Sequence, residues 1–111
     1  MSGIPKRYQE LMSRFPEVGN AYEALGNAVH AAGPLDERTR ALVKIAVSTG
    51  ARLDGAVHSH VRKARKSGVT YGEMVHVVLL SLPTIGFPAM MSALKAVDEI
   101  MRPMDGDKEN Q

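Results

Sequence analysis

The sequence predicts an all-α fold of about six helices. Apolar residues recur at spacings of three and four along most of the chain, helix-starting and helix-ending residues separate these segments, and no stretch alternates as a half-buried strand does. By length, the 111 residues form one domain. We expect a single helical domain over residues 1–103 and a disordered tail over residues 104–111, which is polar and lacks periodicity.

A proline opens each of the first two predicted helices. Pro5 begins the first and Pro16 the second, because proline fits the first turn of a helix. Apolar residues fall on one face of the first helix, at Tyr8, Leu11, Met12 and Phe15. The second helix repeats this spacing, at Val18, Ala21, Tyr22, Leu25, Ala28 and Val29. Gly33 and Pro34 then stop it.

The third predicted helix follows Asp36, which can cap its first turn. It is apolar nearly all round, at Leu42, Val43, Ile45, Ala46 and Val47. That pattern is typical of a central, buried helix. A chain of this length cannot hide so much apolar surface alone, so we expect copies to associate into a homo-oligomer.

The fourth predicted helix begins near Asp54, a plausible N-cap, and carries Val57, Val61 and Ala64 on one side. Its last turn, residues 62–66, is basic and is followed by Gly68. Cations favour the negative end of a helix dipole, and glycine suits the left-handed position after it. We therefore interpret the basic turn as a solvated helix end, with nucleic-acid or membrane binding as the alternative.

Thr70 and Glu73 have the spacing of a capping box and start the fifth predicted helix, which runs to Leu80 and ends at Pro83. A loop over residues 83–88 leads to the sixth helix, which stops at Pro103. Apolar residues share one face of this last helix, at Met90, Met91, Leu94, Val97 and Met101.

The composition excludes several kinds of chemistry. The chain has no cysteine, so disulfides, thiolate nucleophiles and cysteine-bound zinc are impossible. A formal net charge of +2 and few aromatic residues argue against nucleic-acid binding. No apolar run is long enough to span a bilayer, and the N-terminus lacks a signal-peptide core. We expect a cytoplasmic protein with no cofactor, no metal and no nucleic-acid or membrane partner.

Two histidines lie on the fourth predicted helix. His58 and His60 are two residues apart, so they point in roughly opposite directions and cannot form the i, i+4 pair of a helical zinc site. His60 shares a face with Val57 and Val61 and should point inward, where it could act as a general acid and base. The alternative is a core histidine bonded to a carbonyl. His58 points to solvent or a subunit contact, or binds substrate.

Several charged residues have two interpretations. Arg40 could hold a substrate carboxylate, and so could Arg52, for which simple surface charge is the alternative. Asp54 could orient a histidine in place of capping its helix. His76 lies between apolar residues and could pair with His60 across the core to bind a metal, although one such histidine is more often structural.

The segment from Leu35 to Ala96 resembles the carboxymuconolactone decarboxylase family, including its alkylhydroperoxidase-like (AhpD-like) members. The resemblance covers a little over half of the chain. It lies in the order and spacing of the following elements: Leu35-Asp36-x-x-x-Arg40-x-Leu42, an apolar helix, a helix with His60 and Ala64, Gly68-Val69-Thr70 with Glu73, and Ile85-Gly86-Phe87-Pro88. It implies an oligomeric helical bundle with a pocket at a subunit interface.

Departures from the family pattern remove the peroxidase machinery. The two cysteines of the alkylhydroperoxidase-like members fall on Leu53 and Ala56, the histidine between them on Gly55, and a glutamate of the preceding helix on Ala41. Only His60 remains. Thiol-dependent peroxide reduction needs an attacking thiolate and a resolving thiol, so the sequence rules it out.

Two functions remain open. The resemblance implies a lyase that decarboxylates a small carboxylated lactone or a related acid, with His60 as the acid and base and Arg40 holding a carboxylate. The alternative is a catalytically inactive, oligomeric binding or scaffold protein that keeps the fold. The missing glutamate and cysteines favour the second; His60 and the 86–88 loop favour the first.

Overall fold

The computed structural model describes residues 6–102, and within them the regular secondary structure is entirely helical. The chain divides into two compact units, Met1–Asp36 and Glu37–Gln111. The predicted tail, residues 104–111, lies outside the described residues. The prediction of one domain over residues 1–103 stays a prediction.

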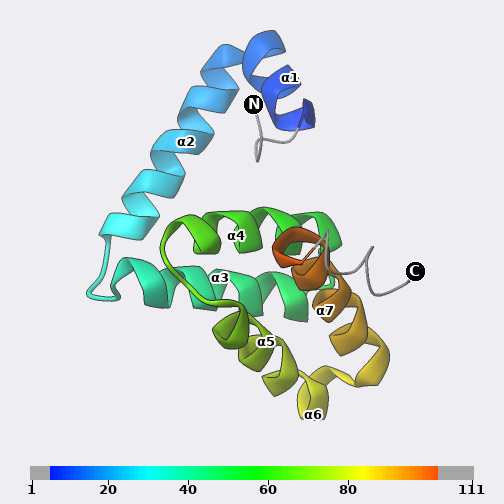
Figure 1. The fold of residues 1–111 in the computed structure, drawn as a ribbon. Coiled ribbons are helices and arrows are strands. Elements are labelled where there is room, and N and C mark those ends of the chain that lie inside the picture. The colour runs from blue at the N-terminus through cyan, green and yellow to red at the C-terminus, as the bar shows by residue number, and fades with distance from the viewer. Residues whose placement is uncertain (1–5, 103–111) are drawn as a thin grey trace. The chain divides into compact units, whose positions relative to one another are not determined.

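The first unit is a pair of helices, α1 (Lys6–Arg14) and α2 (Pro16–Ala31), shown in blue and cyan in Figure 1. Glycine at position 19 of α2 allows the Met12 side chain of α1 to pack against the backbone, because a Cβ there would collide with its sulfur. Nearby, the Tyr8 hydroxyl donates a 3.0 Å hydrogen bond to Glu23. Helix α1 therefore covers the flank of α2 that carries Gly19 and Glu23.

The second unit contains the remaining helices: α3 (Glu37–Gly50), α4 (Asp54–Lys66), α5 (Tyr71–Leu80), the one-turn α6 (Leu82–Ile85) and α7 (Phe87–Met101). Helices α3 and α4 lie side by side and antiparallel (Figure 1). One apolar core holds the unit together, and its largest fully buried side chains are Ile45, Val57, Val61, Met74, Val78 and Val97. Each helix except α6 contributes to it.

Two similar turns end α3 and α4. After α3, Leu53 N–H bonds to Ser48 O and Arg52 N–H to Thr49 O, and Arg52 takes a left-handed φ of 62°. After α4, the same bond pattern places Gly68 at φ 85°. This is the Schellman arrangement, in which glycine is the favoured residue. Gly68 confirms its predicted role, whereas Arg52 holds a conformation that costs an ordinary residue energy.

The start of α5 confirms the predicted capping box. The Thr70 hydroxyl accepts from Glu73 N–H, and the Glu73 carboxylate accepts from Thr70 N–H at 2.8 Å. Arg38 of α3 donates to the same carboxylate and to Gly68 O, each at 2.5 Å. These bonds lower the pKa of Glu73, the Thr70 backbone bond most and the Arg38 bond next. The cap thus also joins α5 to α3.

Three sequence predictions need correction. Helix α3 is not buried all round within one chain, because its neighbours cover one side and leave Val43 and Val47 43% and 61% exposed. Asp54 is not the N-cap of α4; it is the first helical residue, and Leu53 takes the cap position without a side-chain bond. The expected loop after Leu80 contains α6, because proline at the start of a helix does not prevent one turn from forming.

No helix in the described part of the chain is both long and apolar enough to cross a membrane.

Replacing Arg52 by glycine should stabilise the second unit. Glycine adopts the left-handed conformation without the steric cost that a Cβ imposes there, so we expect Arg52→Gly to raise the free energy of unfolding by about 1 kcal/mol. Gly68→Ala should lower it by a similar amount for the same reason. Denaturant unfolding of the three proteins measures both changes. A neutral or destabilising Arg52→Gly would contradict the prediction and indicate that the arginine side chain itself stabilises the turn.

The Glu73 carboxylate should make stability depend on pH. Its pKa is lowered in the folded chain, so ionised Glu73 stabilises the fold above its unfolded pKa, and this contribution is lost as pH falls through the folded pKa. Glu73→Gln keeps an acceptor oxygen but not the charge. We expect its melting temperature to be lower than that of the wild type near pH 7 and the gap to close below about pH 4. Glu10→Gln, at an exposed carboxylate of α1, is the control and should show no such trend.

Candidate functional site

The histidine singled out by the sequence, His60, lies half-buried in the middle of α4. Its neighbours Val57, Val61 and Ala64 are fully buried, so His60 stands at the edge of the face that α4 turns to the core. Ser67, two turns further along α4, shares its flank. Ser67 donates a 2.6 Å hydrogen bond to Glu37 of α3. His60 is therefore on the flank of α4 that faces α3.

The antiparallel pairing determines which part of α3 lies opposite His60. Ser67 contacts Glu37, and both helices rise by the same amount per residue, so the position seven residues later on α3, Lys44, lies opposite the position seven earlier on α4, His60. Lys44 and Arg40, one turn apart on α3, are both half-buried. Lys44 makes no salt bridge to a carboxylate among residues 6–102. This flank therefore combines a histidine with two cations.

The other histidine of α4 is engaged elsewhere. His58 Nδ1 lies 2.8 Å from Asp54 O, and its Nε2 lies 2.8 Å from Glu99 Oε1 of α7. Lys95 also approaches Glu99, at 3.8 Å. His58 thus links α4 to α7 on the flank opposite the one that carries His60.

His76 is exposed on α5 and is not the interior residue that the sequence suggested, so the less favoured interpretation, a metal-binding pair with His60 across the core, is not supported. Its two apolar neighbours in sequence do not bury it, since a helix turns by about 100° per residue. Among residues 6–102, no three histidine or acidic side chains are grouped as a metal site would require.

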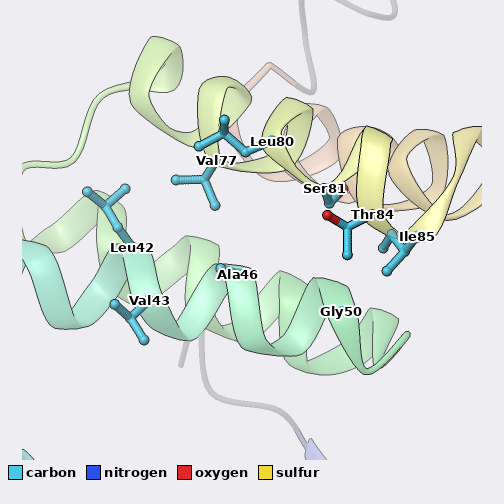
Figure 2. Close-up of a pocket in the computed structure, with 9 residues that line it drawn as sticks. All are labelled: Leu42, Val43, Ala46, Gly50, Val77, Leu80, Ser81, Thr84 and Ile85. Carbon is cyan, nitrogen blue, oxygen red and sulfur yellow. The ribbon is translucent and has the colours of Figure 1, made fainter.

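A second feature of this unit is an apolar groove between α3 and the α5–α6 segment, with a volume of about 400 Å³. In Figure 2, Val77 and Thr84 extend from α5 and α6 toward α3. The Ser81 hydroxyl is already bonded, donating to Val78 O at 2.6 Å. Every described residue that lines the groove is uncharged: Leu42, Val43, Ala46, Gly50, Val77, Leu80, Ser81, Thr84 and Ile85.

The groove and the His60 flank are separate places. Ala46, at the centre of the groove, and Lys44, on the α4 side, are two residues apart and therefore point about 200° away from each other around α3. None of the predicted site residues, Arg40, His58 and His60, lines the groove. Their roles in catalysis and binding stay predictions.

Sequence reasoning missed both Lys44 and the groove. Lys44 had a usable signal, since it follows Arg40 at the one-turn spacing that puts two side chains on one flank. The groove had no such signal in the sequence, because its existence depends on the distance between α3 and the α5–α6 segment in the folded chain.

Comparison with known proteins adds two findings. Residues 16–99, well over half of the chain, match the model of the carboxymuconolactone decarboxylase family. The chain is also similar to a protein of Paracoccus denitrificans described as "Uncharacterized protein 4 in cox locus". The two are 29% identical over 86 residues, which cover 75% of this chain and 78% of the relative.

Proposed function

Because this chain belongs to the carboxymuconolactone decarboxylase family, we propose that it is a cofactor-free lyase that removes carbon dioxide from a small carboxylated lactone or a related acid. The observation that carries the proposal is the half-buried His60 on the flank of α4 that faces two cations of α3. The resemblance noted over residues 35–96 is confirmed by the family match. Cysteine-based peroxide reduction is excluded, because the chain has no thiol.

Decarboxylation of such a lactone needs a proton donor and a conjugated group that can accept the electron pair of the broken bond. The bond between the departing carboxylate and its carbon breaks, carbon dioxide leaves, and the electron pair moves into the conjugated lactone carbonyl. Imidazolium at His60 then gives its proton to carbon, so that the carboxylate and one proton become carbon dioxide and a C–H bond. Histidine suits this step because its charge changes near neutral pH.

The two cations of α3 have a restricted role in this scheme. A cation bound to the departing carboxylate would stabilise the ground state more than the transition state and would slow the reaction. Arg40 and Lys44 should therefore bind a carboxylate that the product retains. Arg40 offers the planar fork that matches a carboxylate, and Lys44 a point charge.

His58 fits a structural role better than substrate binding, because a substrate carboxylate would have to replace Glu99 at its Nε2. A cytoplasmic location stays a prediction from the sequence.

A second function is supported by a separate observation. The groove is apolar and its described lining is uncharged, which suits an apolar ligand or a helix better than a dicarboxylate. An oligomeric binding or scaffold protein would use such a surface without catalysis. Both functions agree with self-association, which we propose because fourteen large hydrophobic side chains among residues 6–102 are at least 38% exposed.

A decarboxylation assay tests the lyase proposal. Incubation with γ-carboxymuconolactone should release carbon dioxide, and His60→Ala should reduce kcat by roughly 10²- to 10⁴-fold, the range expected for loss of a general acid. Arg40→Gln and Lys44→Gln should mainly raise KM, because they bind the retained carboxylate.

His76→Ala is the matched control, since it removes an exposed histidine of the same unit and should leave the rate unchanged. Turnover by the wild type that survives His60→Ala would disprove the role of His60. Absence of turnover in a folded, associated wild type would reject this lactone as the substrate and favour the binding function.

A further inference from the structure

The apolar groove between α3 and the α5–α6 segment differs at its two ends. Figure 2 shows Leu42 and Val43 of α3 at one end. At the other end, Ser81 and Thr84 lie opposite Gly50 of α3. The first end offers hydrocarbon side chains, whereas the second also bears two hydroxyl groups. The groove therefore has an apolar end and a hydroxyl-bearing end.

A third hydroxyl, that of Thr49, belongs to the same end. Thr49 directly precedes Gly50 in the sequence. Around the axis of α3 it falls between Ile45 of the core and Ala46 of the groove, about 40° from the first and about 60° from the second, because each helical residue turns by about 100°. Its side chain is 2% exposed. Thr49 is therefore buried between the core and the hydroxyl-bearing end of the groove.

The Thr49 hydroxyl has no hydrogen-bond partner among residues 6–102. A hydroxyl in a helix commonly bonds to the carbonyl four residues earlier, as Ser48 does with Lys44 O at 2.9 Å. Burial of a hydroxyl without a partner costs free energy, and native structures keep few such groups. A bound group that accepts this hydrogen bond would explain why the hydroxyl is kept.

The other two hydroxyls differ in what they can offer. Ser81 already donates to Val78 O at 2.6 Å, so its oxygen is left only as an acceptor. The Thr84 hydroxyl makes no hydrogen bond to another group of the described chain. The hydroxyl-bearing end thus holds two donors, Thr49 and Thr84, that the described chain does not use.

The charge of the lining restricts the ligand further. Every described residue that lines the groove is uncharged, and Lys44 of α3 points about 200° away from Ala46. A carboxylate or an ammonium group in the groove would lose hydration without gaining a counter-ion. The lining therefore selects an uncharged ligand, and the two unused donors select one with an acceptor oxygen. A carbonyl group meets both conditions.

The groove also has room for such a molecule. Its volume of about 400 Å³ lies in the range of small-molecule sites. Helix α3 contributes two small residues to the lining, Ala46 and Gly50. A Cβ added at Gly50 would meet no other atom within 4 Å, so the space beside this residue is open.

We propose that the groove binds a small, uncharged, mainly hydrocarbon molecule with one carbonyl group. Its hydrocarbon part lies along Leu42, Val43 and Val77, and its oxygen lies at the hydroxyl-bearing end, where Thr49 and Thr84 donate to it. The inference rests on the proposed binding function of the groove and names the class of ligand. It requires neither His60 nor the cations of α3.

The hydroxyls favour this ligand over a helix as the occupant. The apolar face of a helix would fill the groove with hydrocarbon, but its backbone carbonyl oxygens already accept hydrogen bonds within the helix. A helix would therefore leave the Thr49 donor without an acceptor. A free carbonyl compound satisfies it.

A titration with two eight-carbon compounds, 2-octanone and octanoate, tests the ligand class. NMR chemical shifts of the wild type should show saturable binding of the ketone. Octanoate should bind about tenfold more weakly or worse at neutral pH, because the groove offers no counter-ion. Equal binding of the two compounds, or a preference for octanoate, would overturn the proposal.

Substitutions in the groove locate the bound ketone. Ala46→Phe should abolish binding by filling the groove, whereas Val47→Phe, at the neighbouring exposed position outside the groove, is the matched control and should not. Thr84→Val keeps the shape of the side chain and should weaken binding about fivefold, the effect of one hydrogen bond, while Thr84→Ser should restore it. Binding that persists in Ala46→Phe would place the ketone elsewhere and disprove the proposed site.

Thr49→Val supplies a readout that does not depend on the groove being filled. The change removes a buried, unpartnered hydroxyl and keeps the side-chain shape, so it should raise the melting temperature of the free protein while weakening ketone binding. A lower melting temperature would mean that the hydroxyl is already satisfied in the free protein and would remove Thr49 from the site.

Sedimentation of Ala46→Phe separates a ligand from a second copy of the chain. If the wild type binds no ketone and Ala46→Phe lowers its association, the groove is a contact between copies and the proposal is wrong. Decarboxylation of γ-carboxymuconolactone is measured separately. Its outcome is independent of these results, because the His60 flank and the groove lie on opposite sides of α3.

Discussion

The structure is shaped by one constraint: the chain carries more large apolar side chains than its single core can bury. A chain of this length has seven helices to pack within its described part, and its one compact core takes only one side of α3, α4, α5 and α7. Val57, Val61, Met74 and Val97 are fully buried, whereas Val43 and Val47 on α3 stay open. Small domains bury a smaller fraction of their surface than large ones, and here large hydrophobic side chains stay exposed on α2, α3, α5, α6 and α7.

Local rules predicted most of the helical framework. The capping box at Thr70 and Glu73, the glycine turn at Gly68 and the end of the last helix before Pro103 each depend on residues within a few positions of one another, and each is confirmed. One error arose where distant segments decide which side chains are buried. Val47 looks like core by composition, but its side chain is 61% exposed. His76 has apolar neighbours in sequence, yet the turn of the helix directs it outward. Arg52 shows that a turn geometry can be kept without its preferred residue.

The candidate site could be predicted only in part, for a related reason. The sequence identifies His60 through its place on the apolar face of its helix and through the family pattern, and the structure places it half-buried on the flank facing α3. The one-turn spacing from Arg40 places Lys44 on the same flank of α3, but only the hydrogen bond between Ser67 and Glu37 shows that this flank lies opposite His60. The groove is even less visible in the sequence, since its lining residues come from three helices that are brought together only by folding. The proposed catalytic flank and the apolar groove thus lie on opposite sides of one helix, α3.

The outer side of α7 has a consequence for symmetry. Phe87 and Met91 lie on α7, whereas the groove is lined from α3, α5 and α6, so the proposed self-association has two separate apolar surfaces available to it. One self-complementary surface produces a two-fold pair and stops. Two such surfaces continue the assembly, which closes into a point group when their rotation axes meet and extends as a filament when they do not. The angle between two helical faces on a 111-residue chain would then decide between a closed particle and a fibre.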